Sequence, residues 1–112
     1  MMNQSYTEQD WKLFRSRIVG WQEAYMEKLN REYIVLLTAE GDASDKFRAL
    51  EKRIREDKRS TGVSVEMRRS MLRMNLIALY REGVIAWADL EGFSETLLQS
   101  LNLLQREERM LE

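Results

Sequence analysis

Apolar side chains recur at three- and four-residue steps along residues 11–36, and this spacing predicts one long α-helix. The stripe is rich in aromatic rings: Trp11, Phe14, Ile18, Trp21, Tyr25, Leu29, Tyr33 and Leu36. Its mean step is close to the 3.6 residues per turn of an α-helix. Thr7 is a favourable N-cap residue, and Gly41 is suited to the left-handed position that ends a helix. The pattern therefore predicts a helix over about 8–39.

Three further segments carry helical spacing. The segment 44–59 has a thin apolar edge of Phe47, Leu50 and Ile54 in an otherwise charged sequence, which predicts a surface helix that docks by one edge. The segments 65–82 and 87–106 have broader apolar faces, and the short link between them predicts an antiparallel helical hairpin. Because no strand-like alternation is present, the predicted fold is all-α and four-helix bundle-like.

A length of 112 residues suits one domain, so residues 1–112 are expected to form a single helical domain. The two ends, residues 1–6 and 107–112, are polar or charged and are predicted to fray. Gly20 falls inside the first helix. It is either a glycine that the helix tolerates or the mark of a kink or a close helix crossing.

Cysteine and histidine are both absent, which removes several kinds of chemistry. No disulfide can form, in keeping with a cytoplasmic protein. The commonest ligands for zinc, copper, haem and iron–sulfur clusters are missing, as are the nucleophile–base pairs that need His or Cys. Glu23 and Glu27 share a helix face, but a solvated face is favoured over a paired acid site. We therefore expect no enzyme activity, no catalytic residue, no cofactor and no metal.

No segment is suited to a membrane. The longest uncharged apolar run, residues 33–39, is far shorter than the ~20 residues that a membrane span needs. The first six residues lack the apolar stretch of a signal peptide. A membrane partner is therefore not expected.

Charge is unevenly distributed, although the net charge is only −1. Residues 42–82 hold 11 Lys/Arg against 7 Asp/Glu, whereas residues 86–112 hold 2 against 6. A phosphate-contacting face on the second and third helices is one interpretation. It would use Arg53, Arg68, Arg69 and Arg73. The other interpretation, which the near-neutral total favours, is a solvated face that pairs with its own carboxylates, including Glu51, Glu56 and Asp57.

The aromatic stripe of the first helix is longer than the cover that the other helices offer, and this difference predicts a protein interface. Exposed apolar stripes of such size mark binding partners, often a second copy of the chain. Trp and Tyr dominate interface energetics, so the predicted interface residues are Trp11, Phe14, Trp21 and Tyr25. The sequence thus favours a helical interaction or adaptor module that forms a homodimer or binds another protein. The alternative is a nucleic-acid-associated regulator.

Several short segments form a further pattern: Trp11-Lys-Leu-Phe-Arg, Trp21-Gln-Glu-Ala-Tyr-Met-Glu-Lys-Leu, Glu32-Tyr33, Leu50-Glu-Lys-Arg-Ile, Asp57-Lys58, Gly83-Val-Ile and Asp89-Leu90. Together they resemble an uncharacterised family of small helical bacterial proteins, some of which carry the label multidrug transporter. The resemblance runs from about Trp11 to Leu104 and implies a cytosolic helical protein of a mobile element or an accessory gene. It supplies no catalytic motif, and no segment here has the length that the transporter label requires.

Overall fold

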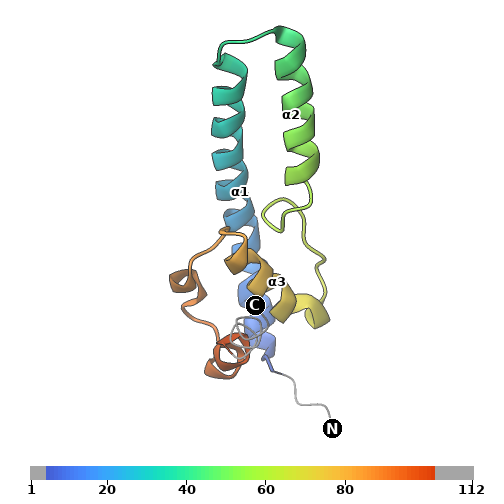
Figure 1. Ribbon diagram of the computed structural model, residues 1–112. Helices are drawn as coiled ribbons and strands as arrows, with labels where there is room; N and C mark the ends of the chain where they lie inside the picture. Colours follow the sequence, from blue (N-terminus) through green and yellow to red (C-terminus); the bar gives the residue numbers. More distant parts are fainter. Residues whose placement is uncertain (1–4, 103–112) are drawn as a thin grey trace.

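A single helix, α1 (Glu8–Thr38), runs through most of the molecule in the computed structural model, which describes residues 5–102 (Figure 1). A capping box starts the helix: Thr7 Oγ1 accepts from the N–H of Asp10 at 3.1 Å, and the Asp10 carboxylate accepts from the N–H of Thr7 at 2.9 Å. Beyond its end, Gly41 adopts a positive φ of 142°. The prediction of a helix over 8–39 is confirmed to within one residue.

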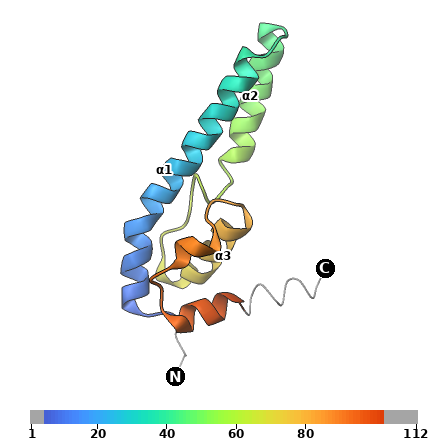
Figure 2. The ribbon, with the colours of Figure 1, turned by 90° about the vertical axis from the view of Figure 1, so that its left-hand side faces the viewer.

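The helix α2 (Ala43–Asp57) runs back alongside the C-terminal half of α1, as both views of the ribbon show (Figures 1 and 2). We call residues 22–58 the arm. None of the residues of α2 is buried, and the buried side chain of α1 in this region is Leu29. The prediction of a charged surface helix that docks by a thin edge is confirmed.

The hydrophobic core lies at the other end of the molecule. It is formed by the N-terminal half of α1, the short helix α3 (Leu72–Arg81) and a helical segment at 95–102, with the connecting segments between them. We call this region the core lobe. Its buried side chains are Trp11, Phe14, Ile18, Leu72, Leu76, Ile77, Leu79, Ile85, Leu90, Phe93, Leu97 and Leu101. The fold is all-α and bundle-like, as the sequence predicts.

The third helix is shorter than predicted. Residues 65–68 are not helical, a 3₁₀ turn η1 occupies Arg69–Met71, and α3 begins at Leu72 rather than at residue 65. The buried Asn75 holds the non-helical stretch in place, since its Nδ2 donates to the carbonyl oxygen of Glu66 at 2.9 Å. Helical spacing alone misplaces this boundary because the chain must first travel from the arm to the core lobe.

The fourth helix begins at residue 95 rather than at 87. Trp87–Leu90 forms only a 3₁₀ turn, η2, and Gly92 follows with a positive φ of 99°. A Cβ at Gly92 would lie 3.0 Å from Nη2 of Arg17, and Arg17 Nη1 donates to the carbonyl oxygens of Asp89 and Glu91. The link after α3 is therefore residues 82–94, rather than the short connection predicted.

Three predictions concern residues at the two ends of the chain. The expected end of the fourth helix, residues 103–106, and the expected frayed residues 1–4 and 107–112 lie outside the described residues. Tyr6, which was also predicted to fray, packs against the core. The fraying prediction is therefore wrong at this position, because the residue before the helix cap covers apolar side chains beneath it.

A buried carboxylate fastens the start of α1 to the start of the last helical segment. Asp10 is 2% exposed, and it accepts from the N–H and the Oγ–H of Ser94 at 2.7 and 2.6 Å. Burial raises the pKa of Asp10, but the hydrogen bonds from Ser94 and Thr7 outweigh it and lower that pKa below its ordinary value. Ser94 Oγ in turn accepts from the N–H of Leu97, so one network caps both helices.

Candidate interaction surface

Two of the four aromatic residues predicted to form an interface are buried, and the other two are half-buried. Trp11 and Phe14 are 6% and 0% exposed, and their rings stack at a centroid distance of 6.0 Å inside the core lobe. The prediction of these two as interface residues is therefore wrong. Trp21 is half-buried and meets Phe14 edge-on at 6.4 Å. Tyr25 is also half-buried, and its ring is covered by a loop.

That loop, residues 59–63, seals the junction between the arm and the core lobe. Gly62 is buried, and a Cβ at this position would lie 2.2 Å from the ring of Tyr25. Gln22 Nε2 donates to the carbonyl oxygen of Thr61 at 3.0 Å, and the hydroxyl of Thr61 bonds to the carboxylate of Glu82 at 3.1 Å. Only glycine permits this close approach of backbone to ring, so Gly62 is required for the loop to pack on Tyr25.

The exposed apolar side chains instead gather on the arm. Five large apolar residues of the arm are more than a third exposed: Ile34, Val35, Leu37, Phe47 and Ile54. Phe47 is the most exposed of the five, with an exposed fraction of 71%. Outside the arm, three more large apolar residues are exposed: Val19, Met67 and Met74. Val19 and Met67 line one hollow of about 360 Å³ at the junction of α1 with the segment 63–67.

The end of α1 is apolar on every side. Residues 33–37 read Tyr-Ile-Val-Leu-Leu, and at 100° per residue five consecutive residues point around the full circumference of a helix. The helix α2 covers one side only, which leaves Ile34 and Val35 59% and 69% exposed. A helix that is apolar all round is normally buried on all sides. This segment therefore lacks cover that the chain itself does not supply.

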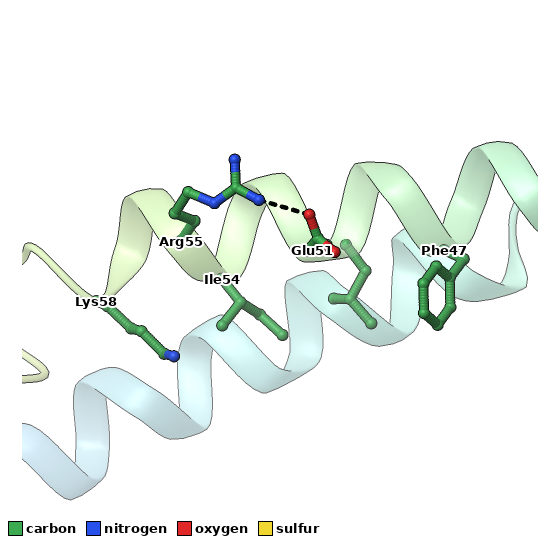
Figure 3. Close-up of a pocket in the computed structure, with 6 residues that line it drawn as sticks. Phe47, Glu51, Ile54, Arg55 and Lys58 are labelled. Atoms are coloured by element: carbon green, nitrogen blue, oxygen red, sulfur yellow. Dashed lines mark hydrogen bonds and ion pairs between the residues drawn. The ribbon is translucent and has the colours of Figure 1, made fainter.

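A shallow groove follows one flank of α2. It has a volume of about 330 Å³ and is lined by Phe47, Leu50, Glu51, Ile54, Arg55 and Lys58, which we call the groove residues. Figure 3 shows that α2 directs three side chains toward α1, those of Phe47, Ile54 and Lys58. The Arg55 side chain instead donates a hydrogen bond to Glu51 on the same helix. A second hollow of about 260 Å³ lies between the two helices and shares Ile54 and Lys58 with the groove. The two hollows therefore belong to one continuous face.

A polar cluster on the arm fixes how α1 and α2 sit against each other. The Tyr33 hydroxyl donates to Asp57 Oδ2 at 2.6 Å, and the Arg53 guanidinium pairs with Glu32 at 2.9 Å and with Asp57 at 3.5 Å. Burial and the hydrogen bond to Asp57 raise the pKa of Tyr33 to about 12. With so little apolar burial in the arm, these contacts set the register of the hairpin.

The four arginines proposed for nucleic acid do not form one basic face. Arg69 makes a two-pronged contact with Glu8 at 3.2 and 2.8 Å, and Arg68 pairs with Glu66 at 2.8 Å. Arg73 is half-buried on α3. Arg53 pairs with Glu32 and Arg69 pairs with Glu8. Because both glutamates lie on α1, the two ion pairs are about 36 Å apart along this helix. The predicted pairing of the basic residues with the chain's own carboxylates is thus seen at Arg53 and at Arg55, which pairs with Glu51.

Acidic side chains do not converge into a metal-binding group anywhere within residues 5–102. Glu23 and Glu27 both point into solvent. None of the helices in this described part of the chain combines the length and the apolar character needed to cross a membrane.

No protein-family model, no curated protein and no solved structure matches this chain. The resemblance of its short segments to small helical bacterial proteins therefore stays a prediction.

Proposed function

We propose that this chain is a non-enzymatic protein–protein interaction module whose contact surface is the open apolar face of the arm. The observation that carries the proposal is the contrast in exposure between Phe47, at 71%, and the fully buried Phe14 of the core lobe. A phenylalanine left in water on a helix that buries nothing else has no structural use in the isolated chain. It is well suited to anchor a partner, since aromatic side chains at the centre of a docking face dominate binding energy.

The electrostatics of the arm support the same assignment. Glu51, Arg55 and Lys58 border the groove, and a polar rim around an apolar centre is the usual anatomy of a protein interface. The core lobe supplies the rigid base, because the helix α1 continues from its buried end into the arm without a break.

Site-specific photo-crosslinking tests this proposal. A photoreactive phenylalanine analogue is placed at Phe47 in one sample and, as the matched control, at Met74, which is 53% exposed on α3 in the core lobe. Both samples are irradiated as purified chain and in extract of the source cells. We expect defined protein–protein adducts from position 47 and none above background from position 74. Equal yields from the two positions would contradict an interaction surface on the arm.

A further inference from the structure

The occupant of this face can be identified from the pattern of the groove residues themselves. Their positions are symmetric about a point between Lys52 and Arg53: Phe47 is as far from that point as Lys58, Leu50 as far as Arg55, and Glu51 as far as Ile54. A two-fold interface uses the same patch on both subunits, so each residue must meet its counterpart across the axis. Helical spacing gives the stripe this symmetry, so the stripe can face its own copy in register, with each apolar side chain opposite a charged one. We infer that the arm of a second copy of this chain docks antiparallel along the groove, an inference that rests on the proposed function.

Charge complementarity selects the antiparallel orientation. In that register Glu51 lies opposite Ile54 of the second copy and within one helical turn of its Lys58, so opposite charges meet. Phe47 lies opposite Lys58 of the second copy, whose methylene stem covers the ring while the ammonium group approaches its face. A parallel docking would set Glu51 against Glu51, and Lys58 against Lys58. Such like-charge contacts are unfavourable.

The same axis covers the Ile34 side of the apolar end of α1 and leaves Val35 outside the contact. The Glu32–Arg53 ion pair and the Tyr33–Asp57 hydrogen bond fix the relative height of the two helices. The midpoint of the groove is therefore level with Ile34 and Val35. Ile34 follows Met26 and Asn30 at four-residue steps, and both line the hollow between the helices. An antiparallel pair of arms thus brings Ile34 of each copy to the axis, and the product is a four-helix bundle built from two hairpins.

The available area fits a reversible dimer. The 15 residues of α2 give a face about 22 Å long, and two adjacent helices are about 20 Å wide. Each copy thus offers roughly 450 Å² in projection, close to half of the ~1,000 Å² that a specific interface requires. An interface at this lower limit associates with modest affinity. The oligomeric state is therefore expected to change with concentration.

Light scattering on the purified chain tests the second copy directly. From micromolar to near-millimolar concentration the mass is expected to rise from 13.4 kDa toward twice that value. Phe47→Glu is expected to stay at the monomer mass. Val35→Glu, on the opposite flank of α1 and equally exposed, is the matched control and is expected to dimerise like the parent. Circular dichroism of both variants should match the parent, since both positions face solvent in one chain.

Cysteine crosslinking tests the orientation, and the absence of native cysteine makes each variant single-site. Ser44→Cys and Lys58→Cys are mixed and treated with a short bismaleimide. Antiparallel docking brings position 44 near position 58 of the second copy, offset by about 4.5 Å along the axis, whereas two copies of position 58 are about 16 Å apart. We expect the mixed adduct and little of either symmetric one; symmetric adducts alone would overturn the antiparallel arrangement.

The outcomes separate this inference from the proposed function. If the parent chain remains at 13.4 kDa throughout, the second copy is excluded. Photo-crosslinks from position 47 to a different protein would then still support an interaction module. If Val35→Glu abolishes the dimer and Phe47→Glu does not, the dimer uses the other face of the arm and the groove assignment fails.

Discussion

The core lobe and the arm are built on the same helix, yet they bury side chains to very different extents. In the core lobe α1 contributes Trp11, Phe14 and Ile18 to a closed core. In the arm its one buried side chain is Leu29, and the opposing α2 buries none. Both halves carry the same helical apolar period. Periodicity therefore reports which side of a helix is apolar, whereas the number of helices packed against that side decides whether it is buried.

Phe14 and Phe47 offer the strongest test of this comparison, because the residue type is identical and only the surroundings differ. Phe14→Ala is expected to cost about 4 kcal/mol in free energy of unfolding, through lost burial and the cavity left behind. Phe47→Ala, measured in dilute solution, is expected to change it by no more than about 0.5 kcal/mol. Urea denaturation followed by circular dichroism measures both. Similar losses for the two variants would mean that the arm is packed in the isolated chain.

Asp10 tests whether the core lobe depends on the link between its first and last helices. Asp10→Ala is expected to cost about 3 kcal/mol, because it removes charged hydrogen bonds and leaves the buried groups of Ser94 unpaired. Glu23→Ala, which alters an exposed carboxylate on the same helix, is the control and should stay within about 0.5 kcal/mol. Equal effects would show that the Asp10 network adds nothing to the stability of the lobe.

The lowered pKa of Asp10 also predicts how the core lobe responds to acid. The ionised carboxylate contributes its full stabilisation above the ordinary value of 3.8, and this contribution is lost as the pH falls through the lowered folded-state pKa. Asp10→Asn should therefore have a flatter dependence of unfolding free energy on pH than the parent, from about pH 5 down to about pH 2. Parallel curves for the two proteins would assign the acid sensitivity to other carboxylates.

Gly62 and Gly20 test the junction between the two regions, with opposite expected signs. Gly62→Ala forces a methyl group against the Tyr25 ring and is expected to cost about 2 kcal/mol. A Cβ added at Gly20 would meet no atom of a neighbouring segment within 4 Å, so the interpretation of this residue as a close helix crossing is wrong. Gly20→Ala is therefore expected to stabilise α1 by about 0.8 kcal/mol. Thermal unfolding shows whether each variant is more or less stable than the parent. A loss of stability in both variants would contradict the open surroundings of Gly20.

Tyr33 gives a smaller expected loss than Gly62 and tests the polar cluster of the arm. Tyr33→Phe removes one hydrogen bond to Asp57 and is expected to cost about 1 kcal/mol. Since the folded-state pKa is raised from 10.0 to about 12, neutral Tyr33 stabilises the fold fully below the unfolded value of 10.0. That contribution is lost as the pH rises toward 12. Urea unfolding at a series of alkaline pH values should show that the unfolding free energy of Tyr33→Phe falls less with pH over this interval than that of the parent. An unchanged slope would assign the pH dependence to another group.

The sequence predicts α1 and α2 well because their ends carry local signals. The capping box at Thr7 and the glycine at Gly41 act within a few residues of the backbone groups that they satisfy. The start of the last helix had equally local signals, a positive-φ glycine at Gly92 and a capping serine at Ser94. The predicted helix over 87–106 places Gly92 in its interior and therefore starts too early.

The candidate surface was less predictable because it depends on tertiary cover. Comparing helix lengths correctly indicates that α1 has more apolar surface than its neighbours bury, but it assigns the excess to the aromatic stripe. Trp11 and Phe14 occupy the part of that stripe that α3 and the segment 95–102 cover. The excess lies in residues 33–37, where Ile34 and Val35 point away from the stripe. Their exposure follows from apolar residues on all sides of a helix that has a single neighbour.

The continuity of α1 gives the molecule the mechanics of a lever. Its 31 residues form a rod about 46 Å long, with roughly half of it clamped in the core lobe and the rest projecting with α2. A rotation of the clamped half by about 5° would displace the tip of the arm by about 2 Å, over a projecting length near 25 Å. A small rearrangement around Asp10 and Ser94 would thereby be amplified at Ile34, near the far end of the same rod, and at Phe47 on the neighbouring α2.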